Sequence, residues 1–200
     1  MAWDVEGTKR ALLDAAVAEF SERGFGGARI ERISERAGVN RERLYSYFGN
    51  KRQLFEAVLA DQLGTILDGV PVTDSGPAAA AGFAGRYFDA CRTHPELPRL
   101  VFWEGLELTH PIDTETRTQR ARRKSAELGD AVGGISERDA AELLLTIVSL
   151  CHAWFASPNL GLIIAGADDD HARRRECVTS AAEAVTRDLV AEFEASGSAG

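Results

Sequence analysis

The apolar residues near the start of the chain recur at the spacing of amphipathic helices. One set follows the order i, i+3, i+4, i+7: Leu13, Ala16, Val17 and Phe20. That spacing puts all four on one face of a helix, which we expect to run from about Thr8 to Gly24. Ile30, Ile33 and Ala37 form a shorter stripe, which predicts a second helix.

Glycine and asparagine residues mark the ends of the next helices. Gly38 supplies the backbone freedom for a tight turn after the second helix. Asn40 can cap a third helix of about two turns, in which Leu44 and Phe48 form an apolar pair at i, i+4. Asn50 can cap a fourth helix, which we expect to fade around residues 69–71. Its apolar stripe comprises Leu54, Phe55, Val58, Leu59 and Ile66.

The rest of the chain is also predicted to be helical. Further helical patterns cover residues 77–93, 96–108, 114–131, 137–156 and 171–195, and no convincing strand pattern occurs. The predicted fold is therefore all-α, with an N-terminal three-helix domain and a C-terminal helical bundle. The expected parts are residues 1–50, a linking helix at 51–70, the bundle at 71–195 and a frayed tail at 196–200.

One apolar stretch raises a membrane-spanning alternative. Leu143 to Ala167 contains no Asp, Glu, Lys or Arg and is long enough to cross a bilayer. His152 and the Ser157-Pro158-Asn159 break interrupt it, so a buried helix followed by an apolar loop is the favoured interpretation.

The start of the chain lacks a secretory signal pattern, which favours the cytoplasm.

Charge is unevenly distributed along the 200 residues. The chain has a formal net charge of −8. Between positions 29 and 52, however, three acids (Glu31, Glu35, Glu42) stand against seven basic residues: Arg29, Arg32, Arg36, Arg41, Arg43, Lys51 and Arg52. A local basic patch is what phosphate binding requires, because salt screens distant charges.

Cys91, Cys151 and Cys177 form no paired motif, and we expect them to be reduced and structural.

The second helix, the turn at Gly38 and the third helix together form a helix-turn-helix pattern. In such a motif the second helix enters the DNA major groove while its apolar face holds it to the domain. With Leu44 and Phe48 turned inward, the opposite side is polar and carries Arg41, Glu42, Arg43, Tyr45, Ser46 and Tyr47. These side chains can contact bases and phosphates. A solvated polar helix face is the alternative interpretation.

Lys51 lies in the first turn of the fourth helix. Free backbone amides and the helix dipole favour an anion there, and a lysine adds a positive charge for a phosphate. An exposed lysine without a partner is the alternative. The predicted role is positioning rather than sequence reading.

The segment from Ile30 to Leu59 resembles the DNA-binding domain of the tetracycline-repressor (TetR) family. The matching pieces are Ile33-x-x-Arg36-Ala37-Gly38-Val39, Leu44-Tyr45-Ser46-Tyr47-Phe48 and Asn50-Lys51-x-x-Leu54-Phe55. The resemblance implies that Tyr45, Tyr47 and Lys51 contact phosphates and the groove, and that positions 41–43 and 46 read bases. Arg29 stands where the family usually has a phosphate-binding threonine, and Arg41-Glu42-Arg43 replaces smaller residues.

The same resemblance implies a ligand-released repressor that binds double-stranded DNA as a homodimer. In the family, the last two helices form the dimer interface, here Glu137–Ala156 and His171–Phe193. One short recognition helix reads too few base pairs to specify an operator. A two-fold dimer carries two such helices and can therefore read a palindrome. No cofactor is implied.

Aromatic residues in the second region predict a pocket for a small-molecule effector. They are Phe83, Tyr87, Phe88, Phe102, Trp103, Trp154 and Phe155, with His152 and Glu104 or Glu107 as polar anchors. For any one of them, plain core packing is the alternative.

Enzymatic functions find little support in the sequence. Gly24-x-Gly26-Gly27 follows a helix and lacks the Lys-Ser/Thr ending of a phosphate loop. The chain carries no HExxH or GxSxG motif. An all-helical enzyme using His152 as a base, and a helical binding protein without DNA activity, stay open as alternatives.

Overall fold

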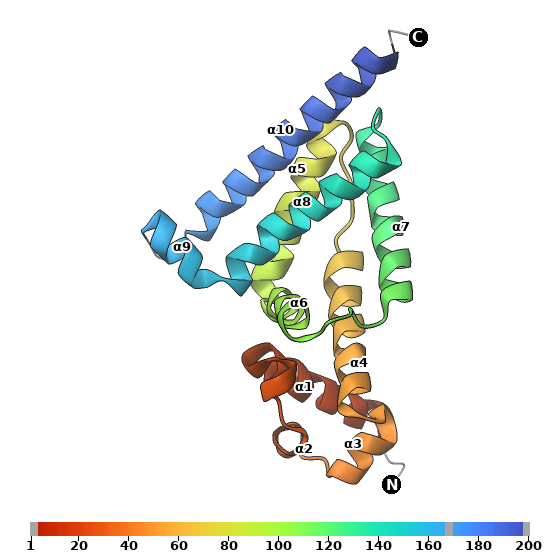
Figure 1. Ribbon diagram of the computed structural model, residues 1–200, viewed down its shortest axis with the longest axis vertical. Helices are drawn as coiled ribbons and strands as arrows, with labels where there is room; N and C mark the ends of the chain where they lie inside the picture. The colour runs from red at the N-terminus through yellow and green to blue at the C-terminus, as the bar shows by residue number, and fades with distance from the viewer. Residues whose placement is uncertain (1–3, 167–169, 198–200) are drawn as a thin grey trace. The chain divides into compact units, whose positions relative to one another are not determined.

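The computed structural model describes residues 4–166 and 170–197, and within these ranges the only regular elements are helices (Figure 1). The all-α prediction is therefore confirmed for the described residues. The chain divides into two compact units. One comprises the residues up to Gly64 together with Glu96–Thr114, and the other comprises Thr65–Pro95 and the residues from Glu115 onwards.

The described residues of the first unit form five helices. They are α1 (Val5–Gly27), α2 (Ile30–Ala37), α3 (Arg41–Phe48), α4 (Lys51–Leu63) and α6 (Glu96–Glu107). Helix α1 packs against α2, α4 and α6. Residues 96–107 were predicted to lie in the C-terminal bundle, whereas the contacts of α6 group it with the N-terminal helices. The functional domain boundaries stay a prediction.

The first unit is built around a core of aromatic and aliphatic side chains. Phe20 and Phe55 meet edge to face with ring centroids 4.9 Å apart, and Phe25 lies 5.4 Å from Phe55. Leu44 is fully buried in this core and Phe48 is partly buried against it. These two contacts hold α3 by its apolar face, as the i, i+4 pair predicted.

The short helices end at the residues that were predicted from local signals. Gly38 adopts φ 65° after α2, a left-handed conformation that glycine tolerates without a steric cost. The Asn40 side chain accepts a hydrogen bond from the Arg43 N–H and caps α3, while Asn50 accepts from the Gln53 N–H and caps α4. Both predicted caps are confirmed.

The second unit holds the remaining helices. A short π-helical segment (Gly64–Asp68) follows α4. The unit's helices are α5 (Pro77–Thr93), α7 (Thr114–Val132), α8 (Glu137–Ala156), α9 (Pro158–Ala165) and α10 (His171–Gly197). Helices α5, α8 and α10 pack against one another (Figure 1). Buried α5 and α8 side chains such as Phe83, Phe88 and Ile147 form the core between them.

Several sequence predictions need correction. Residues 158–165 form a helix rather than an apolar loop, because Pro158 occupies the first turn, where its missing N–H is not needed. Helix α1 continues past Gly24 to Gly27, with a kink at Gly24. Cys91 and Cys151 are free and buried as expected, but Cys177 is exposed. The predicted frayed tail is helical at residues 196–197, and its last three residues lie outside the described ranges.

Helix α8 is long and apolar enough to cross a membrane by length and composition alone. Core helices of soluble proteins meet the same criterion. Leu143, Leu144, Ile147 and Phe155 of α8 are buried within the second unit, where the helix packs against α5 and α10. The contacts of α8 are those expected of a core helix.

Candidate nucleic-acid interface

Helix α3 exposes the polar side that the helix-turn-helix pattern predicted. Arg41, Glu42, Tyr45 and Ser46 are exposed, with Tyr45 39% accessible. Arg43 and Tyr47 are half-buried, and Asn40, the cap of the helix, is exposed. The structure therefore brings the predicted base-reading residues together on one short, solvent-facing helix.

Two of these α3 side chains have charged neighbours within the same unit. Arg41 forms an ion pair with Glu31 at 2.8 Å, and both side chains are about half exposed. Lys9 lies over the Tyr47 ring, 5.8 Å from its centroid. An exposed ion pair contributes little to stability, so Arg41 can leave Glu31 at small cost.

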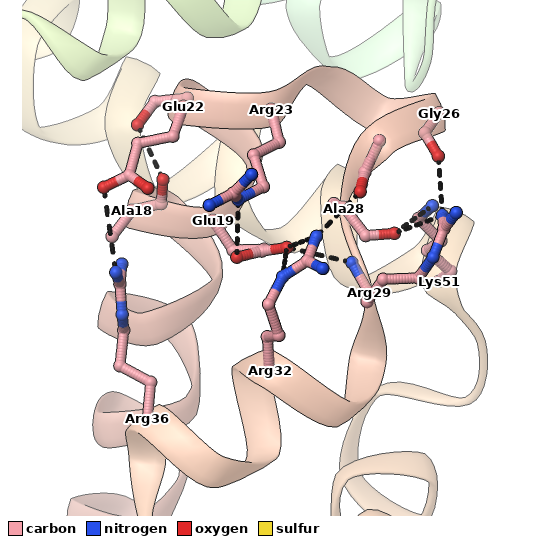
Figure 2. A network of polar contacts seen from close by, with 12 residues as sticks. Ala18, Glu19, Glu22, Arg23, Gly26, Ala28, Arg29, Arg32, Arg36 and Lys51 are labelled. Carbon is pink, nitrogen blue, oxygen red and sulfur yellow. Dashed lines mark hydrogen bonds and ion pairs between the residues drawn. The ribbon is translucent and has the colours of Figure 1, made fainter.

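A buried carboxylate organises the basic residues at the start of α2. Glu19 of α1 is only 3% exposed. Its Oε1 accepts hydrogen bonds from the Arg32 Nε at 2.7 Å and from the Arg29 backbone N–H at 3.0 Å, as Figure 2 shows. Arg23 lies 3.7 Å away from its other oxygen. Glu19 therefore holds the backbone of Arg29, which immediately precedes α2, and the side chain of Arg32, which lies within α2.

The environment of Glu19 lowers the pKa of its carboxyl group. Burial alone would raise this pKa, because it penalises the charged form. The hydrogen bonds from Arg32 and from the Arg29 N–H, together with the positive charges of Arg32 and Arg23, outweigh burial. Glu19 is therefore ionised at neutral pH and serves as a fixed negative centre beneath the basic surface.

Lys51 and Arg29 both donate hydrogen bonds to backbone carbonyls at the end of α1, after the kink at Gly24. The Lys51 ammonium donates to the Ala28 carbonyl at 2.8 Å and lies 4.9 Å from the centroid of the Phe25 ring. The Arg29 guanidinium donates to the Gly26 carbonyl at 3.0 Å. Burial is the main cause that lowers the pKa of Lys51. An ammonium has three donors, so bonding Ala28 leaves two for another acceptor.

The contacts of three acidic residues in this unit were not predicted from the sequence. Glu19 lies between the positions of the predicted apolar stripe, and its burial depends on residues of α2 that reach it. Glu107 was considered only as a pocket anchor, yet its Oε2 accepts the Gly26 N–H at 2.8 Å. Glu104, the other predicted anchor, accepts the Ile112 N–H at 2.8 Å.

The predicted effector residues fall into separate places. Tyr87 and His152 form a buried pair in the second unit, with the hydroxyl oxygen 2.7 Å from Nε2, and Phe83 stacks on Tyr87. Trp154 lines a cavity of about 170 Å³ near α9, and Phe155 is 9% exposed. Phe102 and Trp103 belong to α6 of the first unit.

Comparison with known proteins identifies the family. Residues 12–58 match the model described as bacterial regulatory proteins, tetR family, and residues 80–187 match the tetracyclin repressor-like C-terminal domain. The HTH-type transcriptional repressor SCO4008 of Streptomyces coelicolor is 36% identical over 171 residues, which cover 83% of this chain and 88% of that protein. The chain belongs to the TetR family of transcriptional regulators.

Other relatives support this assignment. The HTH-type transcriptional regulator RutR of Escherichia coli strain K12 is 36% identical over 105 residues, which cover 51% of this chain and 50% of that protein. The crystal structure of the transcriptional regulator SCO4942 from Streptomyces coelicolor superposes with a TM-score of 0.71 at 27% identity, covering 88% of this chain and 96% of that one. These relatives of the TetR-family chain are regulators rather than enzymes.

Family membership establishes a helix-turn-helix DNA-binding domain in this TetR-family regulator. The matched residues 12–58 include all of α2 and α3 and the first part of α4. The roles of individual side chains in DNA or effector binding stay predictions.

Proposed function

We propose that this TetR-family chain is a cytoplasmic, ligand-released repressor that binds a palindromic operator as a homodimer. The observation that carries the proposal is the exposed polar side of α3, held in place by Leu44 and Phe48. A recognition helix needs this arrangement to place side chains against base edges in the major groove. The naming of the relative SCO4008 as a repressor supports the direction of regulation.

The proposed contacts divide into positioning and reading. Arg29, Lys51, Tyr45 and Tyr47 would bind phosphates, because guanidinium, ammonium and phenol groups donate to phosphate oxygens. The base-reading residues proposed are Arg41, Glu42, Arg43 and Ser46, and Asn40 is proposed as a further DNA-binding residue. Breaking the exposed pair between Arg41 and Glu31 would free a guanidinium to bind guanine.

A small-molecule effector would act through the second unit. Core residues there include Phe83, Tyr87 and His152, while Trp154 borders the cavity near α9. Phe155 of α8 completes the candidate set in this unit, whereas Phe102 and Trp103 of α6 belong to the first unit. A ligand can release the operator only if it prefers one conformation of the dimer over the other.

The test of DNA binding is fluorescence anisotropy of the purified chain against duplexes tiling the DNA beside its own gene. We expect one palindromic duplex to bind about 10³-fold more tightly than the others at physiological salt. Equal, weak binding to every duplex from that region and from distant promoters would contradict the proposal.

The Lys51→Ala variant tests the phosphate contact. We expect weaker binding to all duplexes alike, and a plot of log K against log salt that is shallower by about one. Arg52→Ala, which removes the neighbouring exposed cation, is the matched control for charge. If both variants lower affinity and slope equally, Lys51 has no specific role beyond the charge it carries.

The dimer prediction rests on the second unit. Leu145 of α8 and Phe193 of α10 are 59% and 51% exposed in the single chain, and burying such apolar side chains stabilises association. We expect light scattering to report a dimer at micromolar concentration, and the Leu145→Glu/Phe193→Glu double variant to shift toward monomer. Leu106→Glu, at a residue 76% exposed on α6, should stay dimeric. A wild-type monomer would refute the prediction.

A further inference from the structure

The glycine turn, defined as Gly24–Ala28, is the place where three cations of the DNA-binding unit meet. Its carbonyl oxygens at Gly26, Gly27 and Ala28 accept hydrogen bonds from Arg29, Arg32 and Lys51, respectively. Figure 2 shows Arg29, Arg32 and Lys51 around this turn. Because the cations bond to its backbone, a displacement of the glycine turn would move all three.

Helix α6 also contacts this turn. The Glu107 carboxylate accepts the Gly26 N–H at 2.8 Å. One helical turn earlier, the Trp103 indole N–H donates to the Ser21 carbonyl at 3.2 Å. The fit is close at Gly24, where φ is +70° and a Cβ would lie 2.7 Å from Oε1 of Glu107 and 2.9 Å from Cε3 of Trp103. A side chain larger than hydrogen at Gly24 would force these α6 residues away.

The position of Glu107 is not explained by the stability of its own helix. It is the last residue of α6, where the negative end of the helix dipole disfavours a carboxylate. What it gains there is a charge-assisted hydrogen bond to a backbone amide, a stronger contact than a neutral one. Its charge also raises the pKa of Lys51, against the lowering caused by burial and by Arg29.

We propose that Glu107 is a positioning residue for operator binding: by holding the Gly26 N–H, it sets the glycine turn and so places Arg29, Arg32 and Lys51 for the phosphate backbone. The inference rests on the proposed DNA-binding function. Glu107 itself does not contact DNA in this scheme. Its negative charge near the phosphates would repel them, so its charge and its hydrogen bond affect affinity in opposite directions.

Three substitutions separate the two effects. Glu107→Gln keeps an acceptor for Gly26 and removes the charge; Glu107→Asp keeps the charge but is one methylene too short; Glu107→Ala removes both. If Glu107 positions the turn, the Glu107→Asp and Glu107→Ala variants should bind the operator about five- to tenfold more weakly than the wild type. The Glu107→Gln variant should bind it as tightly as the wild type or more tightly. If only charge matters, Asp should equal the wild type, while Gln and Ala should both bind more tightly.

The measurement is operator affinity by fluorescence anisotropy at several salt concentrations, at a temperature where circular dichroism shows every variant folded. Loss of positioning should also make the salt dependence of the Asp and Ala variants shallower by about one, which a plain loss of stability would not do. Glu35→Ala is the control, because it removes an exposed carboxylate of α2. Within the described part of the chain Glu35 makes no contact with the glycine turn, so this variant should not weaken operator binding.

The outcomes distinguish the two proposals. A wild-type protein with no preferred duplex would refute the DNA-binding function itself. A wild type with a clear operator, and an Asp variant that binds it equally well with the same salt dependence, would overturn the role of Glu107 alone. The expected result is weak operator binding by Glu107→Asp and Glu107→Ala, together with binding by Glu107→Gln that is as tight as that of the wild type or tighter.

Discussion

Between pH 7 and pH 5, the free energy of unfolding of the wild-type protein should fall by about 2 kcal/mol more than that of the His152→Gln variant. His152 is 3% exposed, and burial lowers its pKa to about 4. In the unfolded chain a histidine titrates near pH 6.5. Below that pH the unfolded state takes up a proton that the folded state refuses until about pH 4, so acid favours unfolding.

Glutamine is the informative replacement because it cannot titrate and can still pair with the Tyr87 hydroxyl, which lies 2.7 Å from Nε2 of His152. Urea denaturation at fixed protein concentration, at pH 7, 6 and 5, measures the difference. His110→Gln, at an exposed position, is the matched control and should keep the wild-type pH dependence. Parallel curves for the wild type and His152→Gln would show that the buried imidazole does not govern acid stability.

Signals between near neighbours predicted most of the helices of this regulator. The apolar pair Leu44 and Phe48, the Asn40 and Asn50 caps and the Gly38 turn each depend on residues within four positions. Such signals can be read from the local sequence, and the structure confirms them. The resemblance to the TetR family rested on the same segment, and the family models confirm it.

Contacts between distant parts of the chain were not predictable in the same way. Tyr87 and His152 were both named as pocket candidates, but nothing in the sequence pairs two residues that lie on α5 and α8. Phe102 and Trp103 were placed with them because all are aromatic, whereas α6 packs on α1. Composition identifies apolar residues without telling which helix they will cover.

Pro158 illustrates a different reason why a prediction from the sequence was wrong. A proline in an apolar stretch ends a helix when it lies in the interior, and it begins one when it lies in the first turn. Here it does both: α8 ends at Ala156 and α9 begins at Pro158. The break was predicted correctly, but the new helix after it was not, because α9 is only eight residues long and carries no polar face to produce a periodic pattern.

The buried carboxylate of Glu19 should be a major stabilising group of the first unit. We expect Glu19→Ala to lower the free energy of unfolding by about 2 kcal/mol at pH 7, because the Arg29 backbone N–H loses its acceptor and the Arg32 guanidinium loses a charged partner. Glu19→Gln retains an oxygen acceptor and should cost about half as much. Urea denaturation of both variants measures the loss.

The pH dependence of this loss gives a second check. Since the pKa of Glu19 is lowered in the folded state, its ionised form stabilises the fold above the pKa of the unfolded chain, and the effect disappears as pH falls through the folded-state value. The difference between the wild type and Glu19→Gln should therefore shrink in acid. Glu22→Gln, which loses only a half-exposed pair with Arg36 at 3.7 Å, should change stability by less than about 0.5 kcal/mol at any pH. Equal losses for Glu19→Gln and Glu22→Gln would mean that burial of the Glu19 carboxylate adds nothing beyond an ordinary surface contact.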